Sequence, residues 1–172
     1  MYNDEYYMSL ALEEARKAYL LDEVPIGCVI VWNNYVIAST FNRKTIDNVA
    51  TYHAEILAIE KACKYLNNWY LDNCILYTTI EPCLMCTGAI IQSRIPKVVY
   101  GAANSSFGYL SKIDTKIEVT SGVLEKECSS ILSDFFKEKR IKKQNIDKDN
   151  IWFSVKCYFL WRKTKKNVEK KR

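Results

Sequence analysis

The sequence predicts an α/β protein whose sheet is covered by helices on both faces. Short apolar runs rich in β-branched residues alternate with longer segments that have apolar residues at helical spacing. Such alternation is typical of a sheet flanked by helices. The 172 residues suit one domain with a tail, and 49% apolar and 26% charged residues are typical of globular proteins. Collagen-like, low-complexity and wholly disordered proteins are therefore excluded.

The first half of the chain predicts two helices separated by a pair of strands. Residues 4–21 place apolar side chains on one face, as in an amphipathic helix. Residues 26–31 form an apolar run that predicts a buried strand. Two asparagines at 33–34 tolerate the backbone of a tight turn into a second strand over 35–39. Residues 52–66 return to helical spacing.

The second half alternates strands and helices again. Residues 74–79 predict a strand, and residues 81–93 predict a helix because Pro82 suits its first turn. The connection over 102–115 has room for a short helix. Two more strands and a last helix are expected over 97–101, 116–120 and 124–143.

The C-terminal end differs in charge from the rest of the chain. Residues 137–172 carry 14 Lys and Arg against 4 Asp and Glu, whereas residues 1–136 carry 11 against 16. A basic end on an acidic body indicates a polyanionic partner, although the abundance of Lys, Ile, Asn and Tyr also fits an AT-rich coding bias. We divide the chain into a globular domain over 1–143 and a basic, aromatic-containing extension over 144–172 whose end is expected to be disordered.

The extension contains an alternating pattern through 151–161, which favours a strand over an interfacial helix. Its Trp and Phe side chains would form a large apolar patch if exposed, so we expect them to be covered. In order of preference, the segment is an added edge strand, a contact with a partner or a membrane-surface patch.

Neither a membrane span nor export is predicted. No apolar run approaches the roughly 20 residues that a bilayer-spanning helix needs. The N-terminus is acidic and polar, unlike a secretory signal peptide, so we expect a cytoplasmic protein. Seven cysteines, an odd number, indicate metal binding or catalysis rather than a disulfide framework.

One histidine and two cysteines have the spacing of a catalytic zinc site. His53 is the single histidine, and Cys83 and Cys86 lie three residues apart at the start of a predicted helix, where the electropositive N-terminus stabilises thiolates. Zinc prefers imidazole and thiolate ligands, and three protein ligands leave the fourth position of a catalytic site to water. A structural site would need a fourth ligand, and no candidate is obvious. We therefore predict one zinc ion per chain.

Glu55 lies two residues after His53 and is expected to act beside the metal without binding it. A carboxylate there can take a proton from zinc-activated water and return it to a leaving nitrogen. The H-x-E and P-C-x-x-C sequences together form the pattern of the zinc nucleobase deaminases. A zinc-stabilised nucleic-acid-binding module without catalysis is the alternative, but a structural site has no need for Glu55.

The similarity to a known family extends beyond the zinc ligands and covers residues 4–143. It is carried by EVPIGCVIV (23–31), FNR (41–43), HAEILAI (53–59), LYTTIEPCLMCTGAII (76–91), RIPKVVYGA (94–102) and GVLEKECSSILSDFFKEKR (122–140). In these segments the chain resembles the bacterial tRNA adenosine deaminases of the cytidine-deaminase superfamily. The resemblance implies a three-layer α/β/α fold with a five-stranded mixed sheet, and a homodimer. It also implies hydrolytic conversion of adenosine to inosine at the wobble position of a tRNA anticodon.

The resemblance assigns zinc binding and proton transfer to the same four residues as above. It also implies that Asn42 hydrogen-bonds the flipped nucleotide and that the DFF sequence at 134–136 lies near the RNA. The full set of implied substrate contacts is Ile26, Asn42, Ala54, Pro82, Ala103, Asn104 and Phe136.

Asn104 departs from the family, which usually has an aspartate there, and the loop after it is shorter by several residues. A neutral amide repels phosphate less than a carboxylate and also donates a hydrogen bond, which predicts better tolerance of deoxyribose unless the shorter loop compensates. The short loop also favours a second alternative, a deaminase of a free base, nucleoside or nucleotide such as guanine, cytosine or dCMP. The basic C-terminal end instead favours a polymeric substrate.

Overall fold

Five strands form one mixed sheet in the order β2-β1-β3-β4-β5. In this computed structural model, residues 3–145 are described, and residues 1–135 form one unit while the chain from 136 belongs to a second. Strand β1 runs antiparallel to β2 and β3, whereas β3, β4 and β5 run parallel. The strands are β1 (Gly27–Trp32), β2 (Tyr35–Phe41), β3 (Cys74–Ile80), β4 (Lys97–Ala102) and β5 (Glu118–Ser121).

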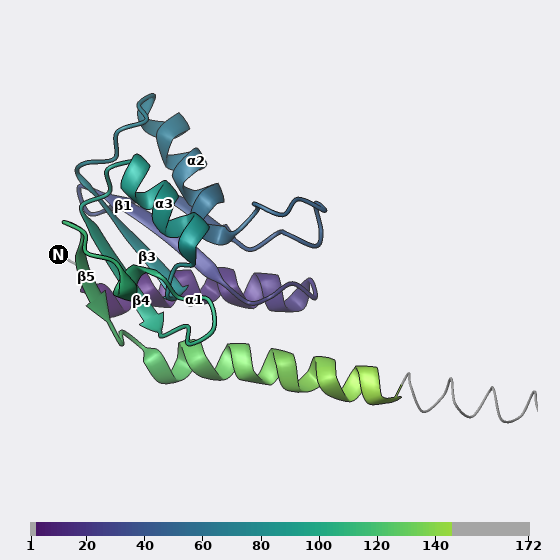
Figure 1. Ribbon diagram of the computed structural model, residues 1–172. Helices are drawn as coiled ribbons and strands as arrows, with labels where there is room; N and C mark the ends of the chain where they lie inside the picture. Colours follow the sequence, from purple (N-terminus) through teal and green to yellow (C-terminus); the bar gives the residue numbers. More distant parts are fainter. Residues whose placement is uncertain (1–2, 146–172) are drawn as a thin grey trace, which may run out of the picture. The chain divides into compact units, whose positions relative to one another are not determined.

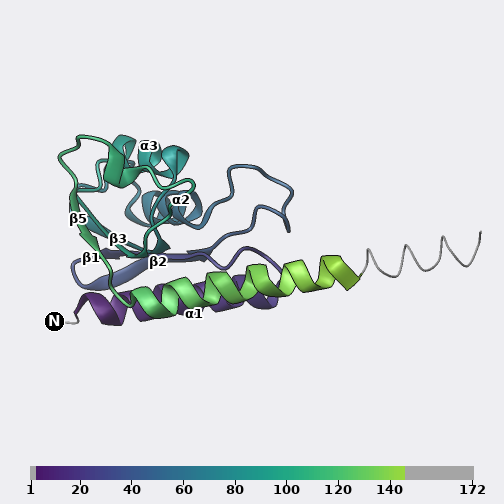
Figure 2. The ribbon, with the colours of Figure 1, turned by 60° about the horizontal axis from the view of Figure 1, so that its bottom comes forward.

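Helices cover both faces of this sheet, which confirms the three-layer α/β/α prediction (Figures 1 and 2). Helix α1 packs on one face, and α2 and α3 lie side by side on the other. A last helix over 125–145 starts on the α1 face, where Cys128 and Ile131 join the core. The remaining helices are α1 (Asp4–Leu20), α2 (Ala54–Leu66), α3 (Leu84–Gln92) and the 3-10 helix η1 (Leu110–Lys112).

The contact between α1 and β1 depends on a glycine. A Cβ atom on Gly27 would lie 1.9 Å from the backbone oxygen of Ala11, so no other residue allows this approach. The side chains of Met8 and Ala11 are fully buried there, against Val29 of β1. The amphipathic helix predicted over 4–21 is therefore confirmed, and its apolar face forms one of the two core layers.

Two helices begin later than the sequence predicts. Residues 52–66 and 81–93 were expected to be helical, but α2 begins after His53 and α3 begins after Cys83, and each of these residues is the N-cap in an extended conformation. Glu81 donates its backbone N–H to the backbone oxygen of Ala102 across 2.9 Å. This bond extends the pairing of β3 with β4, so the chain is still extended at residue 81. Pro82 therefore precedes the helix instead of lying in its first turn.

The turns agree with the sequence. Asn33 and Asn34 have φ angles of 48° and 64°, as a tight hairpin between β1 and β2 requires. The connection over 102–115 does contain a short helix, η1. In the described part of the chain, no helix is long and apolar enough to cross a bilayer. The aromatic pattern at 151–161 and the end of the extension lie outside the described residues.

Candidate active site

Three potential metal ligands meet where α2 and α3 begin. His53 Nδ1 lies 3.7 Å from Cys83 Sγ and 3.6 Å from Cys86 Sγ, and the three ligand atoms all lie within 4.8 Å of one another. Zinc bonds of about 2.1 Å to nitrogen and about 2.3 Å to sulfur, at a tetrahedral angle, place those atoms about 3.6 Å apart. The donor set and its spacing therefore fit a zinc ion.

The hydrogen bonds within this cluster stabilise a negatively charged thiolate, which attracts a metal cation. The pKa of Cys83 falls to about 3, because its thiolate accepts a hydrogen bond from Cys86 and another from His53. The pKa of His53 is raised, chiefly by the same hydrogen bond to Cys83. Both Cys83 and His53 cap helix N-termini, whose backbone dipoles also stabilise negative charge. Cys83 is therefore a thiolate before any metal binds, whereas the hydrogen bond to Cys83 and burial raise the pKa of Cys86.

Glu55 lies in the first turn of α2 and points a carboxylate into the same site. The side chain is 2% exposed, and its Oε2 has no hydrogen-bond partner among the described residues. Burial raises the pKa of Glu55 above its usual value. A buried carboxylate oxygen without a partner is costly to keep, which indicates that this oxygen meets a ligand or a proton.

Three residues expected to contact substrate lie where β1 begins, where β2 ends and where α2 begins. Asn42 follows β2 and its backbone N–H donates to the oxygen of Ile26, 3.0 Å away. Thr40 of β2 donates its hydroxyl to the backbone oxygen of Ala54, 2.8 Å away, which joins β2 to the start of α2. The structure thus brings Ile26, Asn42 and Ala54 into one region beside His53.

Two buried glutamates were not anticipated from the sequence. Glu23 is 1% exposed and accepts hydrogen bonds from Asn42 Nδ2 at 2.9 Å and from the backbone N–H of Ile46 at 2.6 Å. Glu81 is 4% exposed and holds the loop over 103–112. Each is a single acidic residue beside a strand, and no spacing rule in the sequence distinguishes it from a surface charge.

The loop over 103–112 lies against the metal-ligand segment. Gly108 pairs with Cys83 in an antiparallel bridge, and Tyr109 donates its backbone N–H to Pro82 across 3.0 Å. Asn104 uses its side-chain Oδ1 to accept the backbone N–H of Phe107 at 3.0 Å. Because this carbonyl is engaged in the turn, Asn104 would meet a ribose through its Nδ2 donor. Ala103 is exposed at the start of this loop.

The DFF sequence of the last helix divides among different environments. Phe135 is 5% exposed and packs edge-on against Tyr19 with ring centroids 5.5 Å apart, so it is a core residue, and the proximity of this sequence to RNA stays a prediction. Phe136 is exposed but belongs to the second unit, and its predicted role in substrate binding stays a prediction.

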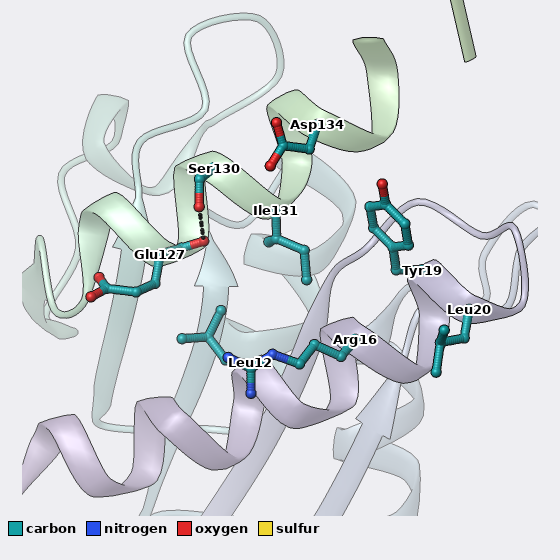
Figure 3. Close-up of a pocket in the computed structure, with 8 residues that line it drawn as sticks. All are labelled: Leu12, Arg16, Tyr19, Leu20, Glu127, Ser130, Ile131 and Asp134. Carbon is teal, nitrogen blue, oxygen red and sulfur yellow. Dashed lines mark hydrogen bonds between the residues drawn. The ribbon is translucent and has the colours of Figure 1, made fainter. Parts of the chain in front are cut away.

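Asp134 lines a different cavity, of about 480 Å³, between α1 and the last helix (Figure 3). Leu12 and Ile131 face each other across it, with Arg16 and Glu127 along its sides. This cavity lies on the α1 face of the sheet, whereas the His53 cluster lies on the face covered by α2 and α3. It is therefore separate from the candidate active site.

Known proteins resemble this chain over most of its length. Residues 1–102 match the family described as the cytidine and deoxycytidylate deaminase zinc-binding region. A Bacillus subtilis protein named tRNA-specific adenosine deaminase is 44% identical over 153 residues, which are 84% of this chain and 95% of that protein.

Solved structures agree with this match. A structure from studies of A-to-I editing by tRNA:A34 deaminases at the wobble position of transfer RNA superposes with a TM-score of 0.71 and 40% identity, over 74% of this chain and 99% of the other. A guanine deaminase from Nitrosomonas europaea gives a TM-score of 0.70 at 26% identity, over 78% and 85%.

Proposed function

Since the chain belongs to the tRNA-specific adenosine deaminases, within the cytidine and deoxycytidylate deaminase family, we propose that it converts adenosine to inosine at the wobble position of a tRNA anticodon. The observation that carries the deaminase assignment is the Oε2 of Glu55, which has no partner within residues 3–145 and lies beside a His, Cys and Cys cluster of zinc-binding geometry. The tRNA substrate is supported by the names of relatives that share 39–44% of their residues with this chain.

The chain binds one zinc ion, and His53, Cys83 and Cys86 are its ligands. When bound, zinc lowers the pKa of a water molecule so that hydroxide is available at neutral pH. Glu55 accepts a proton at Oε2 from the attacking water and delivers it to the exocyclic nitrogen of adenine, which leaves as ammonia. The raised pKa of Glu55 suits both halves of this transfer.

The adenine reaches the site after leaving the stack of the anticodon loop, which costs little in a single-stranded loop. Asn42 hydrogen-bonds the flipped nucleotide, and Glu23 holds the amide of Asn42 in one orientation. The remaining contacts come from the residues beside the metal ligands and in the following loop: Ile26, Ala54, Pro82, Ala103 and Asn104, with Phe136 from the last helix. A tRNA substrate implies that the protein works in the cytoplasm.

The protein acts as a homodimer that uses α3. This nine-residue helix exposes Leu84 at 61% and Ile91 at 43%, and a Cβ on Gly88 between them would meet no atom of the described residues within 4 Å. An exposed apolar stripe with a small central residue suits close packing against a second copy. Sedimentation of Leu84→Lys should give monomers, whereas Leu20→Lys, at the end of α1, should leave the dimer intact.

The function is tested by product analysis. Purified protein with its zinc content measured is incubated with an ACG-anticodon stem-loop, and separately with free adenosine, cytidine and guanine. Inosine at the wobble position, without turnover of the small molecules, is the expected result. Turnover of guanine or another free base without inosine in the RNA would replace this function with salvage of free bases, as the similarity to a guanine deaminase allows.

A further inference from the structure

We infer that Phe107 is a base-stacking residue that recognises a nucleotide next to the deaminated adenosine. This inference rests on the proposed function and adds to it a specificity-determining contact. It comes from the position of Phe107 on a fixed loop beside a metal ligand, and from the exposure of its ring.

Phe107 is exposed although it adjoins the most buried part of the site. Its side chain is 75% exposed, whereas Gly108, the next residue, is buried and pairs with Cys83. Consecutive Cα atoms lie about 3.8 Å apart, and a bridge pair about 5 Å apart, so the Cα of Phe107 lies within about 9 Å of that of Cys83. A nucleotide adjacent to one bound at the metal is within reach of the Phe107 ring.

The loop that carries Phe107 is anchored to a buried carboxylate. Glu81 accepts the backbone N–H of Asn104 at 3.2 Å through Oε2, and the backbone N–H and hydroxyl of Ser111 at 3.0 and 2.7 Å through Oε1. Burial alone would raise the pKa of Glu81, but these hydrogen bonds outweigh burial and lower it, so the carboxylate stays charged. Both ends of the loop are therefore tied to one ionised group.

The backbone of Phe107 is fixed as well. Asn104 accepts its N–H at 3.0 Å, and Gly108 donates its own N–H to the backbone oxygen of Asn104 at 2.8 Å. A Cβ on Gly108 would come within 2.2 Å of Glu81 Oε2, so this position admits only glycine at such close approach. Because the backbone that carries the ring is already fixed, stacking on a base costs little backbone conformational entropy.

Aromatic side chains bind single-stranded RNA by stacking on unpaired bases, and the anticodon loop supplies such bases. Stacking on one base changes affinity by about 5- to 100-fold. The Phe107 ring carries neither a hydroxyl nor a charge that could bind the edge of a base. Its contact therefore depends on whether a base is present to stack, and little on which base it is.

The test combines enzyme variants with altered RNA. Wild type, Phe107→Ala and Phe107→Tyr are assayed on the ACG stem-loop and on two versions in which the nucleotide 5′ or 3′ of the adenosine is abasic. Tyr35→Ala serves as the control, because Tyr35 is 71% exposed in the β1–β2 hairpin, outside the site. Zinc content and oligomeric state are measured for each protein.

Phe107→Ala should lower kcat/KM on the intact stem-loop by about 5- to 100-fold, mainly by raising KM, while Phe107→Tyr and Tyr35→Ala stay near wild type. On one of the two abasic substrates, Phe107→Ala and wild type should become equal. An equal loss on all three substrates, or no loss on any, would overturn the inference while the proposed function stands. A wild-type protein that forms no inosine in the stem-loop would remove the proposed function and this inference together.

Discussion

Asn42 donates its side-chain Nδ2 to the buried carboxylate of Glu23 across 2.9 Å. The same carboxylate accepts the backbone N–H of Thr45 at 2.5 Å and of Ile46 at 2.6 Å. Glu23 thus joins the side chain expected to hold the nucleotide to the loop that follows it. The amide of Asn42 is oriented before substrate arrives, which leaves its carbonyl oxygen and second amide hydrogen for a ligand.

Glu23→Gln should impair substrate binding through Asn42. Glutamine keeps the shape but replaces one acceptor oxygen with a donor, so the variant should lose about 1–3 kcal/mol of stability and show a raised KM with unchanged zinc content. If Glu23 acts through Asn42, the double variant with Asn42→Ala should be no worse in kcat/KM than Asn42→Ala alone. Additive losses would show that Glu23 supports the fold without orienting Asn42.

Glu55→Gln should separate activity from metal binding. We expect full zinc content and a loss of about 100- to 10,000-fold in kcat, because general acid–base catalysis contributes that much. The melting temperature should rise, since the variant removes a buried charge with an unpartnered oxygen. Glu60→Gln, an exposed position on the same helix, is the matched control for helix and charge effects. Retained turnover in Glu55→Gln would exclude Glu55 from proton transfer.

Cys83→Ser should lose the metal and the stability that metal binding adds to the fold. Metal analysis should show less than one zinc per chain, and the melting temperature should fall to that of chelator-treated wild type. Cys63→Ser provides a control, because Cys63 is a half-buried thiol outside the cluster. Zinc should also dissociate more readily as the pH falls, since protons compete for His53, whose pKa is raised in the metal-free protein. Equal zinc content in both serine variants would argue against Cys83 as a ligand.

Gly108→Ala should displace the loop over 103–112. The added methyl would lie 2.2 Å from Glu81 Oε2 and 2.5 Å from the backbone oxygen of Asn104, and backbone cannot move as a side-chain end does. We expect the free energy of unfolding to fall by about 1–3 kcal/mol. Activity on the stem-loop should fall by a larger factor than zinc content. Ser105→Ala, at an exposed position of the same loop, should change neither. Full activity in Gly108→Ala would mean that the loop is not fixed by Glu81.

The cluster of His53, Cys83 and Cys86 beside Glu55 could be predicted from the sequence because each residue contributes to one spacing pattern. The helical and strand periods likewise predicted every element of the described sheet. Glu23 and Glu81 could not be predicted, because their importance comes from burial beside backbone N–H groups of distant residues. The starts of α2 and α3 were misplaced for a related reason: His53 and Cys83 are N-caps in an extended conformation, which residue spacing in the sequence does not reveal.

Phe135 shows a different limit. The resemblance implied only that the DFF sequence lies near the RNA, and the structure adds that Phe135 is buried against Tyr19. The pattern of the last helix could not distinguish an aromatic residue that binds RNA from one that packs on α1, since both lie among charged neighbours in sequence.

The turn at Asn104 bears on how substrate preference can change between lineages. The bond from Phe107 N–H is accepted by a carbonyl oxygen that aspartate also possesses, so exchange between the two residues preserves the loop. The exchange alters only the charge and the hydrogen-bond donors that position 104 presents. We therefore propose that a single codon change at position 104 shifts the balance between ribose and deoxyribose while the loop keeps its backbone, so that the choice of nucleic acid can change without a change of fold.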